Sequence, residues 1–113
     1  MYYEEHDRNV VHIQKAAPQH WFSLGELIRV RNCPTRYGPI SWATQALTSS
    51  EGVVRWKVEA TFEKPFEADL YIHIHPPDRT PLRSATMGEV HSNYIVVPSM
   101  LLAGKTRIEI DVG

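Results

Sequence analysis

The chain has 113 residues, of which 42% are hydrophobic and 22% charged, as in folded globular domains and unlike disordered or membrane-spanning chains. Its formal charge of −1 supplies no field that would attract nucleic acid or anionic lipid, so neither partner is expected. The length allows one domain, and we expect a flexible segment over residues 1–9 followed by a single domain over residues 10–113. Because Cys33 is the chain's one cysteine, packing rather than an intramolecular disulfide must hold the fold together.

Hydrophobic and polar residues alternate through most of the chain, a pattern that predicts strands, and no stretch keeps the 3.6-residue period of a core helix. In chain order, the predicted strands are residues 10–14, 27–32, 40–47, 53–62, 68–75, 91–97 and 106–112. Residues 18–23 are helix-like but long enough only for a turn or a short 3₁₀ segment. The sequence therefore predicts an all-β fold, an antiparallel β-sandwich of about seven strands with at most one short helical turn.

The alternation also assigns inner faces. The residues predicted to point inward are Val54, Trp56, Val58, Ala60 and Phe62 in strand 53–62, Ala68, Leu70, Ile72 and Ile74 in strand 68–75, and Ile108, Ile110 and Val112 in strand 106–112. Trp42 shares the inner face of its strand with Ile40, Thr44 and Ala46, so Trp42 and Trp56 are both expected in the core. We also expect strands 53–62 and 68–75 to pair as a hairpin through residues 63–66.

The outer face of strand 68–75 carries Tyr71, His73 and His75. Aromatic rings on an exposed surface can stack on sugars, so these three residues form a candidate carbohydrate-binding face. Alternation by itself also explains them, as solvated histidines and an aromatic cross-strand pair that contributes about 0.2–1 kcal/mol and needs no ligand. The second explanation is the simpler one.

His73 and His75 could instead chelate a metal ion if further ligands joined them. Glu89 and His91 could supply those ligands from a neighbouring strand, an arrangement that resembles a cupin metal centre and would indicate a small metal-dependent enzyme. A cupin motif places its glutamate a few residues after the second histidine, whereas Glu89 follows His75 by 14 positions. Solvated histidines again explain the spacing without a metal.

No motif for covalent, nucleotide or acid–base chemistry stands out, so we expect no catalytic residue, no cofactor and no enzymatic activity of this domain. Four aromatic residues near the start of the chain lie outside the predicted strands and are the least explained by the core assignment: Tyr2, Tyr3, Trp21 and Phe22. They are candidates for contact with a neighbouring domain. Alternatively, Trp21 and Phe22 close the open end of the sandwich.

The most distinctive run extends from Pro18 to Ser41 and covers about a fifth of the chain. Its characteristic residues are Pro18, Trp21, Gly25, Ile28, Val30, Asn32, Pro34, Thr35, Tyr37, Gly38, Pro39 and Ser41. The run resembles the strand–turn–strand signature near the start of small β-sandwich domains that follow the helical-toroid catalytic domain in some bacterial glycosidase-like proteins. The resemblance implies a non-catalytic C-terminal accessory domain of a larger, carbohydrate-active protein. Cys33 departs from it, since a small residue such as Ala is expected there.

The same run also has an architectural interpretation that needs no ligand. Pro34 and Pro39 stiffen a corner, and Gly38 permits a turn with positive φ. Asn32 and Thr35 can form hydrogen bonds with exposed backbone groups.

Overall fold

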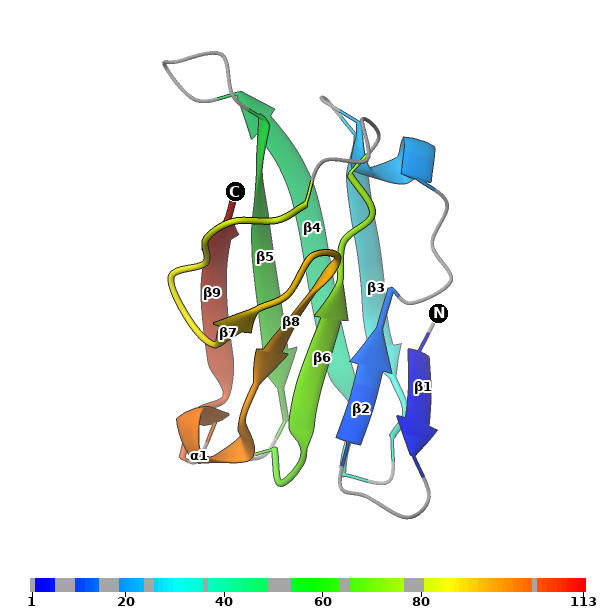
Figure 1. The fold of residues 1–113 in the computed structure, drawn as a ribbon. Coiled ribbons are helices and arrows are strands. Elements are labelled where there is room, and N and C mark those ends of the chain that lie inside the picture. The colour runs from blue at the N-terminus through cyan, green and yellow to red at the C-terminus, as the bar shows by residue number, and fades with distance from the viewer. Residues whose placement is uncertain are drawn as a thin grey trace.

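The computed structural model describes residues 2–5, 10–14, 19–23, 26–35, 37–48, 54–63, 66–76, 81–102 and 104–113. These residues form two sheets packed face to face (Figure 1). Sheet A contains, in spatial order, β1 (Tyr2–Glu5), β2 (Val10–Ile13), β6 (Asp69–His73), β8 (Tyr94–Val97) and β7 (Glu89–Val90). Sheet B contains β3 (Leu27–Cys33), β4 (Ile40–Thr48), β5 (Val54–Phe62) and β9 (Arg107–Val112). The predicted all-β sandwich is confirmed.

Two strands and one helix were not expected from the sequence. Strand β1 lies within residues 1–9, where no regular strand was predicted, and pairs with β2. The short β7 pairs with β8. The predicted helical turn is present as the 3₁₀ helix η1 (Gln19–Phe22), and Ser99–Leu102 form one short α-helix, α1, that was not predicted. Its first N–H, on Ser99, donates to Asp69 Oδ1 at 2.8 Å, which supplies one of the partners that a helix start lacks.

The predicted hairpin of β5 with β6 is wrong. Strand β5 pairs with β4 and β9 in sheet B, whereas β6 pairs with β2 and β8 in sheet A. Each strand has an apolar face, and placing the strands in opposite sheets lets these two faces pack against each other. Phe66, between the strands, is buried and stacks on Phe62 with ring centroids 4.9 Å apart. Among the described strands only β2 and β6 are parallel.

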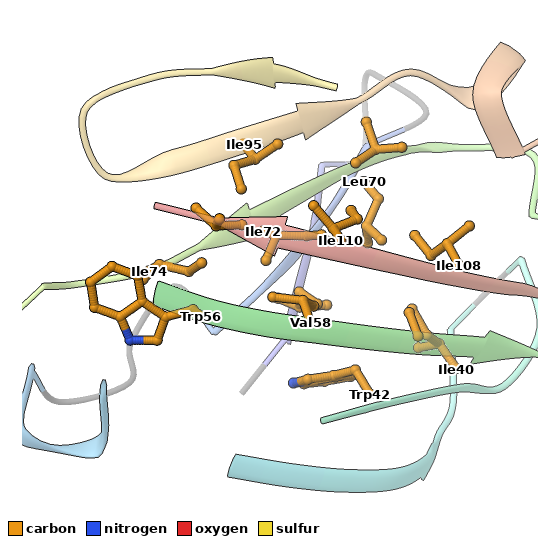
Figure 2. Close-up of a cluster of buried hydrophobic side chains, with 14 of the residues drawn as sticks. Ile40, Trp42, Trp56, Val58, Leu70, Ile72, Ile74, Ile95, Ile108 and Ile110 are labelled. Atoms are coloured by element: carbon orange, nitrogen blue, oxygen red, sulfur yellow. The ribbon is translucent and has the colours of Figure 1, made fainter. Parts of the chain in front are cut away.

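The inner faces assigned from alternation form the core (Figure 2). All of the residues predicted to point inward are buried except Val54, the first residue of β5, which is half-buried. Trp42 and Trp56 both lie in this core, as predicted. Trp56 Nε1 donates a hydrogen bond of 2.9 Å to the carbonyl of Phe22, which fastens η1 to β5.

The corner after β3 has the structure expected for its proline, glycine and threonine residues. Thr35 Oγ1 accepts a hydrogen bond from the Tyr37 N–H at 3.1 Å and donates one to the Gly38 carbonyl at 2.7 Å. Gly38 has a φ of 110°. Asn32 acts through its backbone: it has a φ of 51°, and its N–H donates to Ser41 Oγ at 2.8 Å where the register of β3 and β4 shifts. The architectural interpretation is therefore confirmed for Gly38 and Thr35.

The two outer strands of sheet B have different surroundings. Residues 83–86 run beside β9, where Ala85 pairs with Val112, and then lead into β7 of sheet A. That connection closes one side of the sandwich. The other outer strand is β3, which has η1 beside it (Figure 1). In the described part of the chain, no helix is long and apolar enough to cross a membrane.

Candidate functional site

The outer face of sheet A carries a band of aromatic side chains from β2, β6 and β8 and from the turn between β7 and β8. We call His12, Tyr71, His73, Tyr94 and His91 the aromatic band. The register places His12 opposite Tyr71 and His73 opposite Tyr94. Their sequence neighbours, among them Val11, Ile72 and Ile95, point into the core, so the pleat turns the band outward.

Two histidines of the band bond directly to each other. His12 Nδ1 and His73 Nε2 lie 2.8 Å apart, and their ring centroids are 5.1 Å apart, so the rings meet edge to edge. One nitrogen must donate and the other accept, which requires complementary tautomers. The residues are only 7% and 8% exposed. His73 is therefore not the solvated histidine expected from the sequence, because β2 brings His12 alongside it.

The remaining rings of the band stack on one another. Tyr94 lies nearly parallel to Tyr71, with centroids 5.7 Å apart, and nearly parallel to His91, with centroids 4.4 Å apart. His91 Nε2 also lies 3.2 Å from Glu89 Oε1. A ring that binds sugar by stacking must offer an open face, but Tyr94 lies between two other rings. The geometry therefore favours cross-strand stabilisation of the sheet over a sugar platform.

The predicted group of Tyr71, His73 and His75 is only partly assembled. Tyr71 and His73 are members of the band, whereas the His75 ring lies 6.5 Å from that of His73. His75 instead forms a T-shaped contact with Phe22, with ring centroids 5.6 Å apart.

The predicted metal-ligand set, His73, His75, Glu89 and His91, is not brought together. Strand β8 lies between β6 and β7, so the Tyr94 ring separates His73 from His91. Within the residues that the structure describes, no three His, Cys, Asp or Glu side chains form a group that could hold a metal ion.

A second surface lies at the β3 side of sheet B. Trp21, Leu27 and Leu47 are 38%, 49% and 40% exposed, and we call them the apolar edge surface. Leu27 pairs with Gln45, so Leu47, two residues further along β4, is its diagonal neighbour on the outer face. Trp21 and residues 26–30 line a hollow of about 370 Å³. Two large, exposed apolar side chains, Trp21 and Leu27, therefore line this hollow.

The four aromatic residues predicted for a domain interface separate in the structure. Trp21 belongs to the apolar edge surface. Phe22 is 1% exposed and closes the sandwich beneath it, so its assignment to an interface is wrong. The reason is the 3₁₀ turn, which points neighbouring side chains in different directions. The side chains of Tyr2 and Tyr3 lie outside the described residues.

Sequence reasoning missed His12 and Tyr94 in the band and Leu27 and Leu47 at the edge. A signal was present for each, since all four lie within predicted strands and alternate with apolar residues that the structure buries. What was lacking was the order of the strands in space. Without that order, outward residues from different strands cannot be assembled into a surface.

Comparison with known proteins gives no match for this chain. No family model fits it, and no curated protein or solved structure matches it.

Proposed function

We propose that this chain is a non-catalytic β-sandwich accessory module that packs against and supports a neighbouring domain of a larger, carbohydrate-active protein. The observation that carries the proposal is the apolar edge surface. Single exposed hydrophobic residues are common on soluble proteins. Trp21 and Leu27 instead line one hollow, and Leu47 is the diagonal neighbour of Leu27, as at surfaces that contact another protein.

The position of Trp21 supports this role. Its neighbour Phe22 is buried, and the Phe22 carbonyl accepts the hydrogen bond from Trp56. The turn that presents Trp21 at the surface is therefore fixed to the core. Because this turn is already ordered, little further backbone entropy is lost when Trp21 contacts a partner. Tryptophan is also enriched among the residues that contribute most of the binding energy at protein interfaces.

The resemblance of residues 18–41 to the start of accessory domains also supports the proposal. Trp21 and Leu27 both fall within this run. In such an arrangement the catalytic groups belong to the neighbouring domain, and the module contributes contact area. Contacts between domains of one chain typically cover about 600–1,500 Å².

Oxidative footprinting of Trp21 tests the proposal. We expect Trp21 to be oxidised at least about tenfold more slowly in the complete protein encoded by the gene than in this chain alone, because a neighbouring domain covers it. The double variant Trp21→Ser, Leu47→Ser should make the module cleavable by protease in the complete protein. Met100→Ser is the matched control, because Met100 is 79% exposed on α1, away from this surface.

Two results would contradict the proposal. The first is equal oxidation of Trp21 in the complete protein and in the chain alone. The second is turnover of a glycoside substrate by the 113-residue chain itself.

A further inference from the structure

The outer face of sheet B is hollowed along β4. Ala43 stands between Arg29 of β3 and Glu59 of β5 in the sheet register. A methyl side chain between two long ones leaves a depression. Two hollows of about 110 and 280 Å³ meet here, and both include Arg29, Ala43 and Glu59. Their side chains form the β4 trough: Leu27, Arg29 and Arg31 on β3, Ser41, Ala43 and Gln45 on β4, and Lys57, Glu59 and Thr61 on β5.

The β5 wall of the trough belongs to an ion network. Lys57 Nζ lies 2.7 Å from Glu109 Oε1 and 3.5 Å from Glu59 Oε1. Arg107 Nη2 lies 3.7 Å from Glu59 Oε1 on the other side. Glu59 thus lies between two cations, and it lines the same hollow as Thr61.

The β3 wall is cationic. Arg29 and Arg31 are exposed, lie about 7 Å apart along the strand, and share the outer face. Within the described part of the chain, no carboxylate lies within ion-pair distance of either guanidinium. A guanidinium that has no carboxylate nearby can bind the carboxylate of a ligand through two parallel hydrogen bonds.

We propose that the β4 trough binds oligosaccharides that contain uronic acids. The sugar carboxylates meet Arg29 and Arg31, and the ring hydroxyls meet Glu59, Gln45 and the hydroxyls of Ser41 and Thr61. A sugar acid combines these two chemistries, since it carries one carboxylate per ring and several hydroxyls that both donate and accept hydrogen bonds.

The position of the trough in the sheet disfavours an acidic peptide as its ligand. An extended peptide is recognised most readily at a sheet edge, where backbone groups are unpaired. The trough lies instead over β4, which pairs with β3 on one side and β5 on the other. A peptide would have to bind there through side chains alone.

This inference does not rest on the proposed function. The trough lies on the face of sheet B. Of its residues, Leu27 belongs to the apolar edge surface, and Leu27 and Arg29 also line the hollow beside Trp21; Arg31, Ala43, Lys57 and Glu59 do not. The module could therefore dock on a neighbour without binding a sugar acid, or the reverse. The variants below avoid Trp21, Leu27 and Leu47 for that reason.

Calorimetric titration of the chain with tetragalacturonate tests the inference, at an ionic strength near 0.15 M so that non-specific attraction is screened. We expect tetragalacturonate to bind at least about tenfold more tightly than the neutral cellotetraose. Arg29→Ala should weaken tetragalacturonate binding about tenfold. Arg29→Lys keeps the charge but lacks the planar guanidinium, so its affinity should lie between those of the unchanged chain and Arg29→Ala. Ala43→Leu fills the trough without changing charge and should weaken binding as well.

Arg83→Ala is the matched control, because Arg83 is exposed beside β9 and its loss changes the net charge equally. The thermal transition of each variant shows that it is folded. Absence of tetragalacturonate binding would overturn the inference, as would equal affinity for cellotetraose or equal losses in Arg83→Ala and Arg29→Ala. If a hexaglutamate peptide bound as tightly as tetragalacturonate or more tightly, the inference would be overturned in favour of an acidic peptide as the ligand.

Discussion

Trp56 joins the core to the η1 turn through one side chain. Its ring is buried on the inner face of β5, and its Nε1 donates to the carbonyl of Phe22. The side chain therefore provides apolar burial and also fixes the turn that presents Trp21. Loss of the ring should affect both stability and the apolar edge surface.

We expect Trp56→Ala to lower the free energy of unfolding by about 3–5 kcal/mol, because it leaves a large void in a small core. Trp56→Phe keeps an aromatic ring but removes the bond to Phe22, and should cost less, about 1–2 kcal/mol. Urea unfolding measures both. A loss below about 1 kcal/mol for Trp56→Ala would contradict the burial of this ring.

Two glycines with positive φ differ in what surrounds them. Gly88 has a φ of 85°, and a Cβ added there would lie 2.5 Å from the backbone oxygen of Val96. Gly104 has a φ of 73°, and an added Cβ would meet nothing within 4 Å. Alanine is strained at both positions, but it also clashes at Gly88.

Gly88→Ala should therefore destabilise the protein by at least about 1 kcal/mol more than Gly104→Ala. Thermal or urea unfolding of the two variants side by side checks the difference. Equal losses would show that β8 can move away from the added methyl group.

At the scale of elements, β5 and β9 are joined by charges as well as by their hydrogen-bonded ladder. Glu59 and Glu109 stand directly opposite each other, and like charges so placed destabilise a sheet. Lys57 and Arg107 lie on either side and compensate. The hydrogen bond to Lys57 lowers the pKa of Glu109, and the hydrogen bond to Glu109 raises the pKa of Lys57.

The directions of these two pKa shifts make the stability of the protein depend on pH. A lowered Glu109 pKa means that its contribution to stability is present above the ordinary glutamate pKa and lost as the pH falls through the lowered value. A raised Lys57 pKa means that its contribution is present at lower pH and lost as the pH rises through the raised value. Both groups are exposed, so the contributions are small.

Lys57→Met should raise the pKa of Glu109 toward its ordinary value. Titration of the Glu109 carboxylate carbon by NMR measures this shift. Lys105→Met removes a cation elsewhere on the surface and should leave the Glu109 pKa unchanged. An unchanged Glu109 pKa in Lys57→Met would contradict the network.

At the scale of the whole molecule, the two sheets share one core. Inward residues of β5 and β9 and those of β6 and β8 belong to a single buried cluster (Figure 2). Neither sheet would bury its apolar face alone, so the sheets should unfold together.

We expect the far-UV circular dichroism of the chain to be dominated by strand. Urea transitions followed by this signal and by tryptophan fluorescence should coincide, because Trp42 and Trp56 lie in the shared core. Two separate transitions would show that the sheets fold independently.

The sequence by itself determined which residues point inward. Strands have a period of two, so the alternation in residues 53–62 and 106–112 assigned inner faces that the structure confirms. Local chemistry likewise predicted the Gly38 turn and the short helical turn at η1. Each of these features depends on residues a few positions apart, and that information is contained in the sequence pattern.

Only the tertiary structure decided which strands are neighbours. The separation of β5 and β6 into different sheets and the parallel pairing of β2 with β6 depend on how all apolar faces are buried at once. The sites depend on the same choice, because the contact of His12 with His73 and the trough between Arg29 and Glu59 each join residues on different strands. Alternation gives the face of every outward residue but not its neighbours across the sheet, since any two strands with apolar faces can pair.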